Sequence, residues 1–254
     1  MANQNIRTPR FYIDEISYLL SRGVTQDGEF DVTATDAGDK FMGTFTTGSE
    51  PELFDMKPLN KCTFDTSADT DGHVLITIDT QSATSKKSYI AILNHNLLSS
   101  VGKIRVFAGD IATDVIALDG ANAETADITW ADNTLTEVVN ADTTTAAADD
   151  KSVVIEPAAD GTTIVTFPET SLRYWGIQFE GSGFSGEFPG TGVATIGRWG
   201  STDLFVGGIM IGEYFDMPHA PDLSVKRSIA FDNVSVQESV GGQRYSNMAS
   251  HGRQ

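Results

Sequence analysis

Apolar and polar residues alternate over short stretches along most of the chain, and few stretches repeat at the spacing of a helix. Residues 73–80 alternate in this way and are typical of a strand with one buried face. Residues 173–180 join two aromatic side chains to an alternation of Ile177 and Phe179 with Gly and Gln, which also indicates a strand. About ten to twelve such strands can be counted, without a long amphipathic helix. The pattern predicts an all-β chain folded as a jelly-roll-like β-sandwich with long loops.

The stretch 88–110 is the centre of this pattern. Residues 88–93 are apolar and rich in strand-forming types, and residues 103–107 form a second short strand. The intervening Asn-His-Asn, residues 94–96, carries side chains that can bond the backbone and so end the first strand. Two strands are not stable alone in water, so we expect a second sheet to cover them. We expect His95 to be a hydrogen-bonded corner residue rather than a catalytic base.

A helical spacing occurs near the start of the chain. Residues 11–13 favour a strand or an extended N-terminal arm. After them, Ile16, Leu19 and Leu20 mark one face of a short helix that Gly23 could cap.

A turn signal lies at residues 158–161, where the sequence is Ala-Ala-Asp-Gly. Stretches with strand-like composition flank it at residues 152–156 and 162–167. Two strands joined by a short turn of this composition predict a β-hairpin.

Composition divides the chain into three parts. We expect residues 1–60 to form an N-terminal arm and a segment lying on the surface, residues 61–240 the β-sandwich, and residues 241–254 a polar tail. Residues 121–150 are rich in Ala, Thr, Asp and Asn, and we expect them to form an insertion or a long loop.

The balance of charge limits the kinds of partner. The chain has 254 residues, of which 17 are Lys or Arg and 35 are Asp or Glu, for a formal net charge of −18. Such a surface repels phosphate backbones and anionic lipids, so we expect no nucleic-acid binding. The first residues lack the apolar stretch of a secretion signal, and no apolar run approaches the roughly 18 residues of a membrane helix. We therefore expect synthesis in the cytoplasm without membrane insertion.

Residue types for catalysis or metal binding do not occur at the required spacings. Residues 65–72 are rich in Asp, but an EF-hand loop aligned on Gly72 would begin at Ser67 and end at Ile78, and neither is acidic. The four histidines have no second ligand at metal-binding spacing. Cys62 is the single cysteine, which excludes an internal disulfide and favours a buried thiol. We predict no catalytic, cofactor or metal site; a hydrolase that uses two carboxylates is the enzymatic alternative.

Aromatic residues are the remaining candidates for binding. Trp199, beside Arg198 in a loop-like Gly-Arg-Trp-Gly segment, could stack on a sugar ring, whereas Trp175 lies in a strand and is expected in the core. Core packing or a subunit contact is the other interpretation of Trp199. Phe11 and Tyr12, in the expected arm, form a second candidate contact. These two pairs are the candidate subunit or glycan contacts of the sequence.

Three segments, taken in order, resemble parts of tail-associated structural proteins of tailed bacteriophages. Residues 92–110 (ILNHNLLSSVGKIRVFAGD) resemble a segment in which Asn-His-Asn-Leu precedes an Ile-Arg-Val strand. Residues 173–181 (RYWGIQFEG) resemble a strand with paired aromatic residues. Residues 207–224 (GGIMIGEYFDMPHAPDLS) resemble a segment of the form G-x-x-x-x-G-E-x-F-x-x-P, and residues 7–14 (RTPRFYID) resemble the opening of virion proteins. The strand order also resembles a discoidin-like, galactose-binding-type jelly roll.

The resemblance implies a function without catalysis. It implies a structural protein of the virion, in the tail or tail tip, that is made in the host cytoplasm and assembles with copies of itself and with other virion proteins. It supplies no catalytic residues, and a jelly roll alone does not imply a sugar site. The alternatives are a capsid decoration or fibre protein, and a carbohydrate-binding module that recognises host surface glycans.

Overall fold

The structure is a computed structural model that describes residues 9–24, 30–32, 44–68, 73–112, 115, 137–140, 143–145, 152–187, 195–218, 230–231, 234–238, 244–248 and 252–253. In these residues the chain consists mainly of antiparallel strands, with one α-helix and one 3₁₀ helix, so the predicted all-β sandwich is confirmed. Close contacts divide the chain into two units, residues 11–215 and residues 1–10 with 216–254. No helix in the described ranges is long and apolar enough to span a membrane.

The first sheet of the sandwich has five strands in the order β1-β15-β6-β11-β8. Its members are β1 (Arg10–Asp14), β15 (Gly208–Asp216), β6 (Lys87–His95), β11 (Gly161–Thr170) and β8 (Glu137–Val139). The central strand β6 pairs with both neighbours in antiparallel register, and Ile90 lies opposite Val165 and Ile211. The apolar residues predicted to form a buried strand therefore lie in the middle of this sheet.

The second sheet has seven strands in the order β2-β5-β12-β7-β10-β9, with β13 beside β12. Its members are β2 (Phe30–Val32), β5 (Val74–Asp79), β12 (Tyr174–Glu187), β7 (Gly102–Gly109), β10 (Ser152–Glu156), β9 (Thr143–Thr145) and β13 (Thr195–Gly197). On the central strand β12, Ile177 lies opposite Ile76 of β5 and Val106 of β7. The two clearest strand signals of the sequence are thus direct neighbours.

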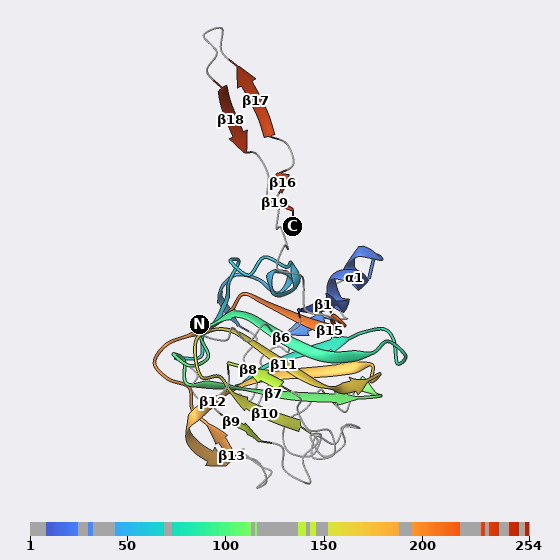
Figure 1. Cartoon of the computed structure of the whole chain (residues 1–254). Helices are drawn as coiled ribbons and strands as arrows, with labels where there is room; N and C mark the ends of the chain where they lie inside the picture. The colour runs from blue at the N-terminus through green and yellow to red at the C-terminus, as the bar shows by residue number, and fades with distance from the viewer. Residues whose placement is uncertain are drawn as a thin grey trace, which may run out of the picture. The chain divides into compact units, whose positions relative to one another are not determined.

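The hydrophobic core lies between the two sheets, which stack as layers (Figure 1). Successive residues of a strand point to opposite faces, so each strand contributes alternate apolar side chains. The buried core residues include Ile90, Ile92, Val165, Phe167, Ile209 and Ile211 of the first sheet and Ile76, Ile104, Val106, Trp175, Ile177 and Phe179 of the second. Trp175 lies in the core as expected, stacked at 5.3 Å from the ring of Phe167, and its Nε1 donates to the carbonyl oxygen of Leu172.

The central stretch of the sequence passes from one sheet to the other. Its first strand, β6, belongs to the first sheet, and its second strand, β7, belongs to the second. The two strands therefore lie in facing layers, and each is covered by the sheet that contains the other.

The predicted hairpin at residues 158–161 is wrong. Strand β10 pairs with β7 and β9 in the second sheet, whereas β11 pairs with β6 and β8 in the first. The chain does bend here, and Gly161 has a φ of +128°. Turn composition predicts a change of direction, but the choice of strand partner depends on residues distant in sequence.

A helix and a small sheet complete the larger unit. Helix α1 (Glu15–Ser21) follows β1 directly, and Asp14 Oδ2 accepts a hydrogen bond from Ser17 N at 2.9 Å. Ile16 and Leu19 are buried, as their spacing predicts. The small sheet has the order β14-β4-β3, and η1 precedes β4. Their bounds are β14 (Leu204–Val206), β4 (Cys62–Phe64), β3 (Phe45–Thr47) and η1 (Glu50–Phe54).

Cys62 is a buried free thiol, as expected from the sequence. Its Sγ lies 3.1 Å from the carbonyl oxygen of Ser49. Burial raises the pKa of the thiol to about 12, so it stays protonated at neutral pH.

The division of the chain into arm, sandwich and tail stays a prediction, and some of its segments contain strands of the two sheets. In the expected arm, β1 joins the first sheet, and in the expected insertion β8 and β9 each end a sheet. Residues 121–136, 141–142 and 146–150 of that insertion lie outside the described residues.

The smaller unit contains two ladders of two antiparallel strands each. In one, β16 (Ala230–Phe231) pairs with β19 (Gly252–Arg253), and in the other β17 (Val234–Glu238) pairs with β18 (Arg244–Met248). Part of the segment predicted as a polar tail is therefore strand.

Candidate functional site

Three apolar side chains at the edge of the first sheet are exposed to solvent. Phe11 is 56% exposed, and Ile13 and Phe215 are each 57% exposed. Phe11 and Ile13 are two residues apart in β1, so they point to the same face, and Phe215 lies on the neighbouring strand β15. We call these three residues the apolar edge.

Strands β1 and β15 run in opposite directions. The ring of Tyr12 lies 6.3 Å from that of Tyr214. Gly212 approaches Ile13 so closely that a Cβ at Gly212 would lie 2.1 Å from the carbonyl oxygen of Ile13. Residue numbers therefore rise along one strand as they fall along the other, and residues 11 and 215 of the apolar edge face each other.

The opposite face of β1 is fixed by aromatic packing. The ring of Tyr12 is half-buried and meets the ring of Tyr89 edge-on, with centroids 4.7 Å apart and an angle of 67°. Tyr89 is fully buried, and this burial raises the pKa of its phenol. Of the two contact residues predicted here, Tyr12 therefore holds β1 on the sheet, whereas Phe11 faces solvent.

In the part of the chain that the structure describes, β1 ends the first sheet and pairs with β15 alone. The outer side of such a strand presents backbone N–H and C=O groups that no strand of the sheet satisfies, and it is a template for a further strand. An open strand edge beside exposed apolar side chains has the chemistry of an assembly surface.

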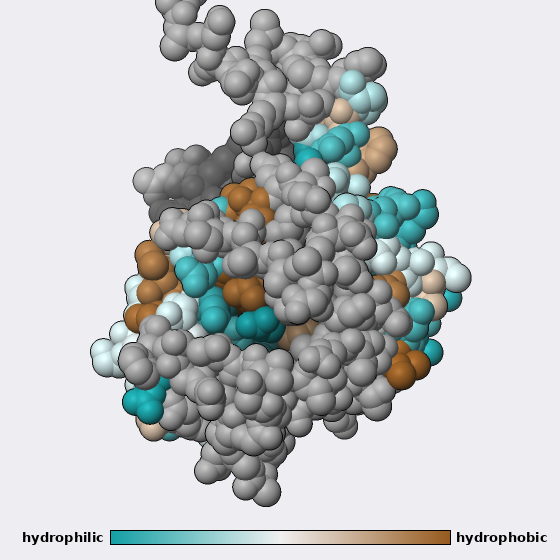
Figure 2. Space-filling view, turned by 90° about the horizontal axis from the view of Figure 1, so that it is seen from below, coloured by the Kyte–Doolittle hydropathy of each residue, from teal (hydrophilic) through white to brown (hydrophobic). Residues whose placement is uncertain are grey.

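Apolar side chains are scattered on another part of the surface. Figure 2 shows separate hydrophobic groups with hydrophilic side chains between them among the coloured residues. Ile111 is 58% exposed, and Leu59, 87% exposed, lies three residues from Met56, which is 42% exposed. Scattered residues of this kind are ordinary on protein surfaces.

The second predicted contact, Arg198 with Trp199, lies at a separate place. Trp199 is only 5% exposed and belongs to the core, whereas Arg198 is exposed. The indole lies over Gly102 of β7, where a Cβ would come within 2.5 Å of a ring carbon, and the backbone of both residues lies against Gly181 of β12. Of the two interpretations of Trp199, core packing is the one observed, and its ring offers no open face to a sugar.

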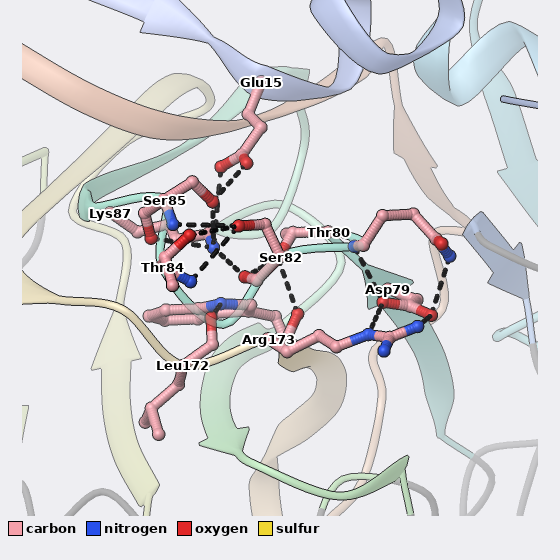
Figure 3. A network of polar contacts seen from close by, with 11 residues as sticks. Glu15, Asp79, Thr80, Ser82, Thr84, Ser85, Lys87, Leu172 and Arg173 are labelled. Atoms are coloured by element: carbon pink, nitrogen blue, oxygen red, sulfur yellow. Dashed lines mark hydrogen bonds and ion pairs between the residues drawn. The ribbon is translucent and has the colours of Figure 1, made fainter. Parts of the chain in front are cut away.

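A buried lysine forms a polar network that the sequence did not indicate (Figure 3). The side chain of Lys87 is fully buried, and Nζ donates to the carbonyl oxygens of Ser82 and Ser85 at 3.0 Å and to Ser85 Oγ at 2.7 Å. Glu15 Oε2 lies 3.7 Å from the same nitrogen, and its other oxygen accepts from Ser85 Oγ at 2.5 Å. Burial lowers the pKa of Lys87, although the charge of Glu15 opposes this.

This network joins the loop between β5 and β6 to helix α1. A serine beside a lysine is also the arrangement of some nucleophilic sites. Here the Lys87 ammonium is directed at two carbonyl oxygens and a carboxylate, which are partners of the charged form and not of a free base. The contacts therefore describe a structural clamp.

The clamp continues to the start of β12. Arg173 binds Asp79 with two hydrogen bonds of 2.7 Å, and Thr80 Oγ1 donates to the carbonyl oxygen of Arg173 at 2.7 Å (Figure 3). A bidentate pair of this kind fixes orientation as well as distance. The end of β5 is thereby held to the start of β12.

A second charged cluster lies across β7 and β12. Glu180 is buried, and its carboxylate lies 2.9 Å from Arg105 Nη2 and 3.2 Å from Lys103 Nζ, while Gln178 donates to it at 2.5 Å. Burial alone would raise the pKa of Glu180, but the charges of Arg105 and Lys103 keep this pKa below its usual value. Glu180 is therefore a fixed anion at neutral pH and not a proton donor.

The Asn-His-Asn corner forms hydrogen bonds to several distant segments. His95 is 1% exposed; its Nδ1 accepts from Leu97 N at 3.2 Å, so Nε2 carries the proton that is donated to Thr163 Oγ1 at 2.8 Å. Burial lowers the pKa of His95 to about 4, so the ring is neutral at pH 7. Asn96 Oδ1 accepts from Phe205 N at 2.7 Å and thereby joins the corner to β14. The interpretation of His95 as a hydrogen-bonded corner is confirmed.

Comparisons with known proteins found no relative of this chain. No protein-family model, no curated protein and no solved structure matches the chain. In the described ranges, no group of three or more His, Cys, Asp or Glu residues is placed to hold a metal ion. The charged and hydrogen-bonded clusters described above stabilise the fold, whereas the exposed side chains of the apolar edge do not.

Proposed function

We propose that this chain is a non-enzymatic structural protein of a tailed-bacteriophage virion, located in the tail or tail tip and assembled as a homo-oligomer. The observation that carries the proposal is the apolar edge, because three large apolar side chains stay exposed beside an open strand edge. Burying such a surface against another subunit gains hydrophobic free energy that the isolated chain forgoes.

The three segments that resemble phage tail proteins supply the second support. Residues 92–110 include the end of β6, the Asn-His-Asn corner and β7, residues 173–181 open β12, and residues 207–224 include β15. Strand β12 pairs with β7, and β15 pairs with β6. The segments that carry the resemblance are therefore neighbours in the sandwich, as expected if a shared frame underlies their order.

The buried clusters agree with a structural role. Lys87, Glu180 and His95 each bind groups within the fold, and their contacts are those of fixed charges or of a fixed neutral ring. A virion subunit needs a rigid body with defined contacts and does not need a group that exchanges protons with a substrate.

The test is whether the protein is part of phage particles. Particles purified from an induced culture of the source organism are analysed by mass spectrometry and labelled with gold-conjugated antibodies against the recombinant chain. Label on tails supports the proposal, and label on the capsid surface or on fibres supports a decoration or fibre protein instead. Particles that lack the chain, in cells that express it, contradict both.

A further inference from the structure

We propose that β1 pairs with β1 of a second copy of this chain, antiparallel and around a two-fold axis at Tyr12. This inference rests on the proposed homo-oligomer and names the surface and the partner that form it. It follows from three properties of the strand: which backbone groups face outward, which side chains share a face, and how charge is distributed along it.

The backbone of β1 alternates between the two sides of the strand. Met217 N donates to the carbonyl oxygen of Pro9 at 3.0 Å, and Gly212 lies against the carbonyl oxygen of Ile13. Odd-numbered residues thus turn their backbone groups toward β15, so Tyr12 and Asp14 direct theirs to the open edge. When two copies of β1 pair around Tyr12, the two Tyr12 residues exchange two backbone N–H···O=C hydrogen bonds. Each Asp14 N–H then donates to the Arg10 carbonyl oxygen of the other copy.

The same register matches the side chains. The strand reads Arg-Phe-Tyr-Ile-Asp, a cation, an apolar residue, an aromatic residue, an apolar residue and an anion. In an antiparallel pair centred on Tyr12, Phe11 lies opposite Ile13 of the other copy, and Arg10 lies opposite Asp14. Every residue meets a complementary one, and the two-fold axis makes each contact twice.

The two ends of the strand carry opposite charges, Arg10 and Asp14. Asp14 Oδ2 accepts from Ser17 N, whereas Oδ1 is buried without a hydrogen-bond partner in the structure. Arg10 already binds Asp216 within the chain, with Nε 2.6 Å from Oδ1 and Nη2 3.3 Å from Oδ2, so the second copy would meet an arginine whose position is fixed. Because Oδ1 is buried within the chain itself, the second copy's Arg10 meets the charge of the Asp14 carboxylate and not this atom.

The proposed contact between two β1 strands buries little surface, so we expect the dimer to be weak. Stable protein interfaces bury about 1,200–2,000 Å², and one five-residue strand with two exposed apolar side chains, beside Phe215 of β15, covers less. We therefore expect a reversible dimer in the micromolar range, which further contacts in a larger assembly would reinforce.

Two exposed isoleucines provide a matched pair of variants. Ile13, 57% exposed, lies in the proposed interface, and Ile111, 58% exposed, lies outside it. In sedimentation velocity over a concentration series, Ile13→Lys should raise the dimer dissociation constant at least tenfold, because a lysine at a strand edge opposes pairing. Ile111→Lys should leave it within about twofold. Equal effects of the two variants would overturn the assignment of the interface.

A mixing experiment tests the register. In a dimer of the Arg10→Glu variant, the new glutamate would lie opposite Asp14 of the other copy. In a dimer of the Asp14→Lys variant, the new lysine would lie opposite Arg10. Like charges then meet, so each variant alone should be monomeric. An equimolar mixture should restore dimers that contain one copy of each, because every facing pair then has opposite charges. Damage to the fold cannot produce this rescue. Dimers formed equally well by each variant alone, or a mixture that stays monomeric, would contradict the proposed register.

The two proposals fail separately. Phage particles that contain the chain, with no effect of Ile13→Lys on its self-association, would refute the β1 pairing and leave the virion function. Rescue in the mixture, with particles that lack the chain, would support the pairing and refute the virion function.

Discussion

At the scale of single residues, most of the unusual chemistry of this protein stabilises the fold. Lys87 was not predicted as a buried residue, because lysine is usually exposed and a sequence does not show which carbonyl oxygens converge on it. Trp199 was placed in a loop-like segment, yet Gly102 and Gly181 leave room for it to pack in the core. His95 was predicted correctly because the corner depends on Asn and His side chains that bond the nearby backbone, which a short stretch of sequence shows.

Replacing Lys87 should destabilise the fold strongly. Lys87→Met removes the donor for two carbonyl oxygens and the counter-charge of Glu15, and a broken buried pair costs about 3 kcal/mol. Its neighbour is the control, since Lys86 pairs with Glu169 on the surface and is 58% exposed. Urea unfolding should show a large loss for Lys87→Met and no clear change for Lys86→Met. Equal losses would contradict the clamp.

His95 should make stability depend on pH. Its pKa is about 4 in the fold, where burial lowers it and Asp160 partly opposes, and about 6.5 in the unfolded chain. Between these values the unfolded state binds more protons, so stability falls as pH falls from 6.5 to 4, by about 3 kcal/mol in total. His95→Gln should be less stable at pH 7 and should lose less stability on acidification to pH 5, as measured by urea unfolding. A parallel pH dependence in both proteins would contradict a neutral buried ring.

At the scale of elements, strands were predictable from sequence and their partners were not. Residues 73–80 and 173–180 alternate locally, and the structure places them in β5 and β12, which pair with each other. The turn at residues 158–161 predicted a hairpin, but β10 and β11 join different sheets, because partner choice is decided by the whole core. Likewise, the segment predicted as an arm contains β1, whose place on the sheet depends on Tyr12 packing against Tyr89 from a distant strand.

The close packing of β1 against β15 depends on one glycine of β15. A Cβ at Gly212 would lie 2.1 Å from Ile13 O, whereas at Gly208, four residues earlier in the same strand, the nearest atom would be 3.6 Å away. Gly212→Ala should therefore displace β1, and Gly208→Ala should not. Hydrogen exchange should show lost protection in residues 10–14 for Gly212→Ala only. Unchanged protection in that variant would show that β1 is held in another way.

At the scale of the whole molecule, charge and assembly oppose each other. A net charge of −18 keeps copies apart at low ionic strength, whereas in the proposed dimer the apolar edge and the paired backbone groups draw two copies together. Screening by salt should therefore strengthen self-association. The composition predicted the repulsion, but the surface proposed to overcome it could not be located before β1 was seen at the edge of a sheet.

The most direct test of self-assembly through β1 is the mass of the native chain in solution across a concentration series at moderate salt. Sedimentation velocity should show a monomer at low concentration that gives way reversibly to a dimer in the micromolar range, with the transition shifted to lower concentration by added salt. A single monomer mass at every concentration and salt level would contradict the claim that this sheet edge is an assembly surface.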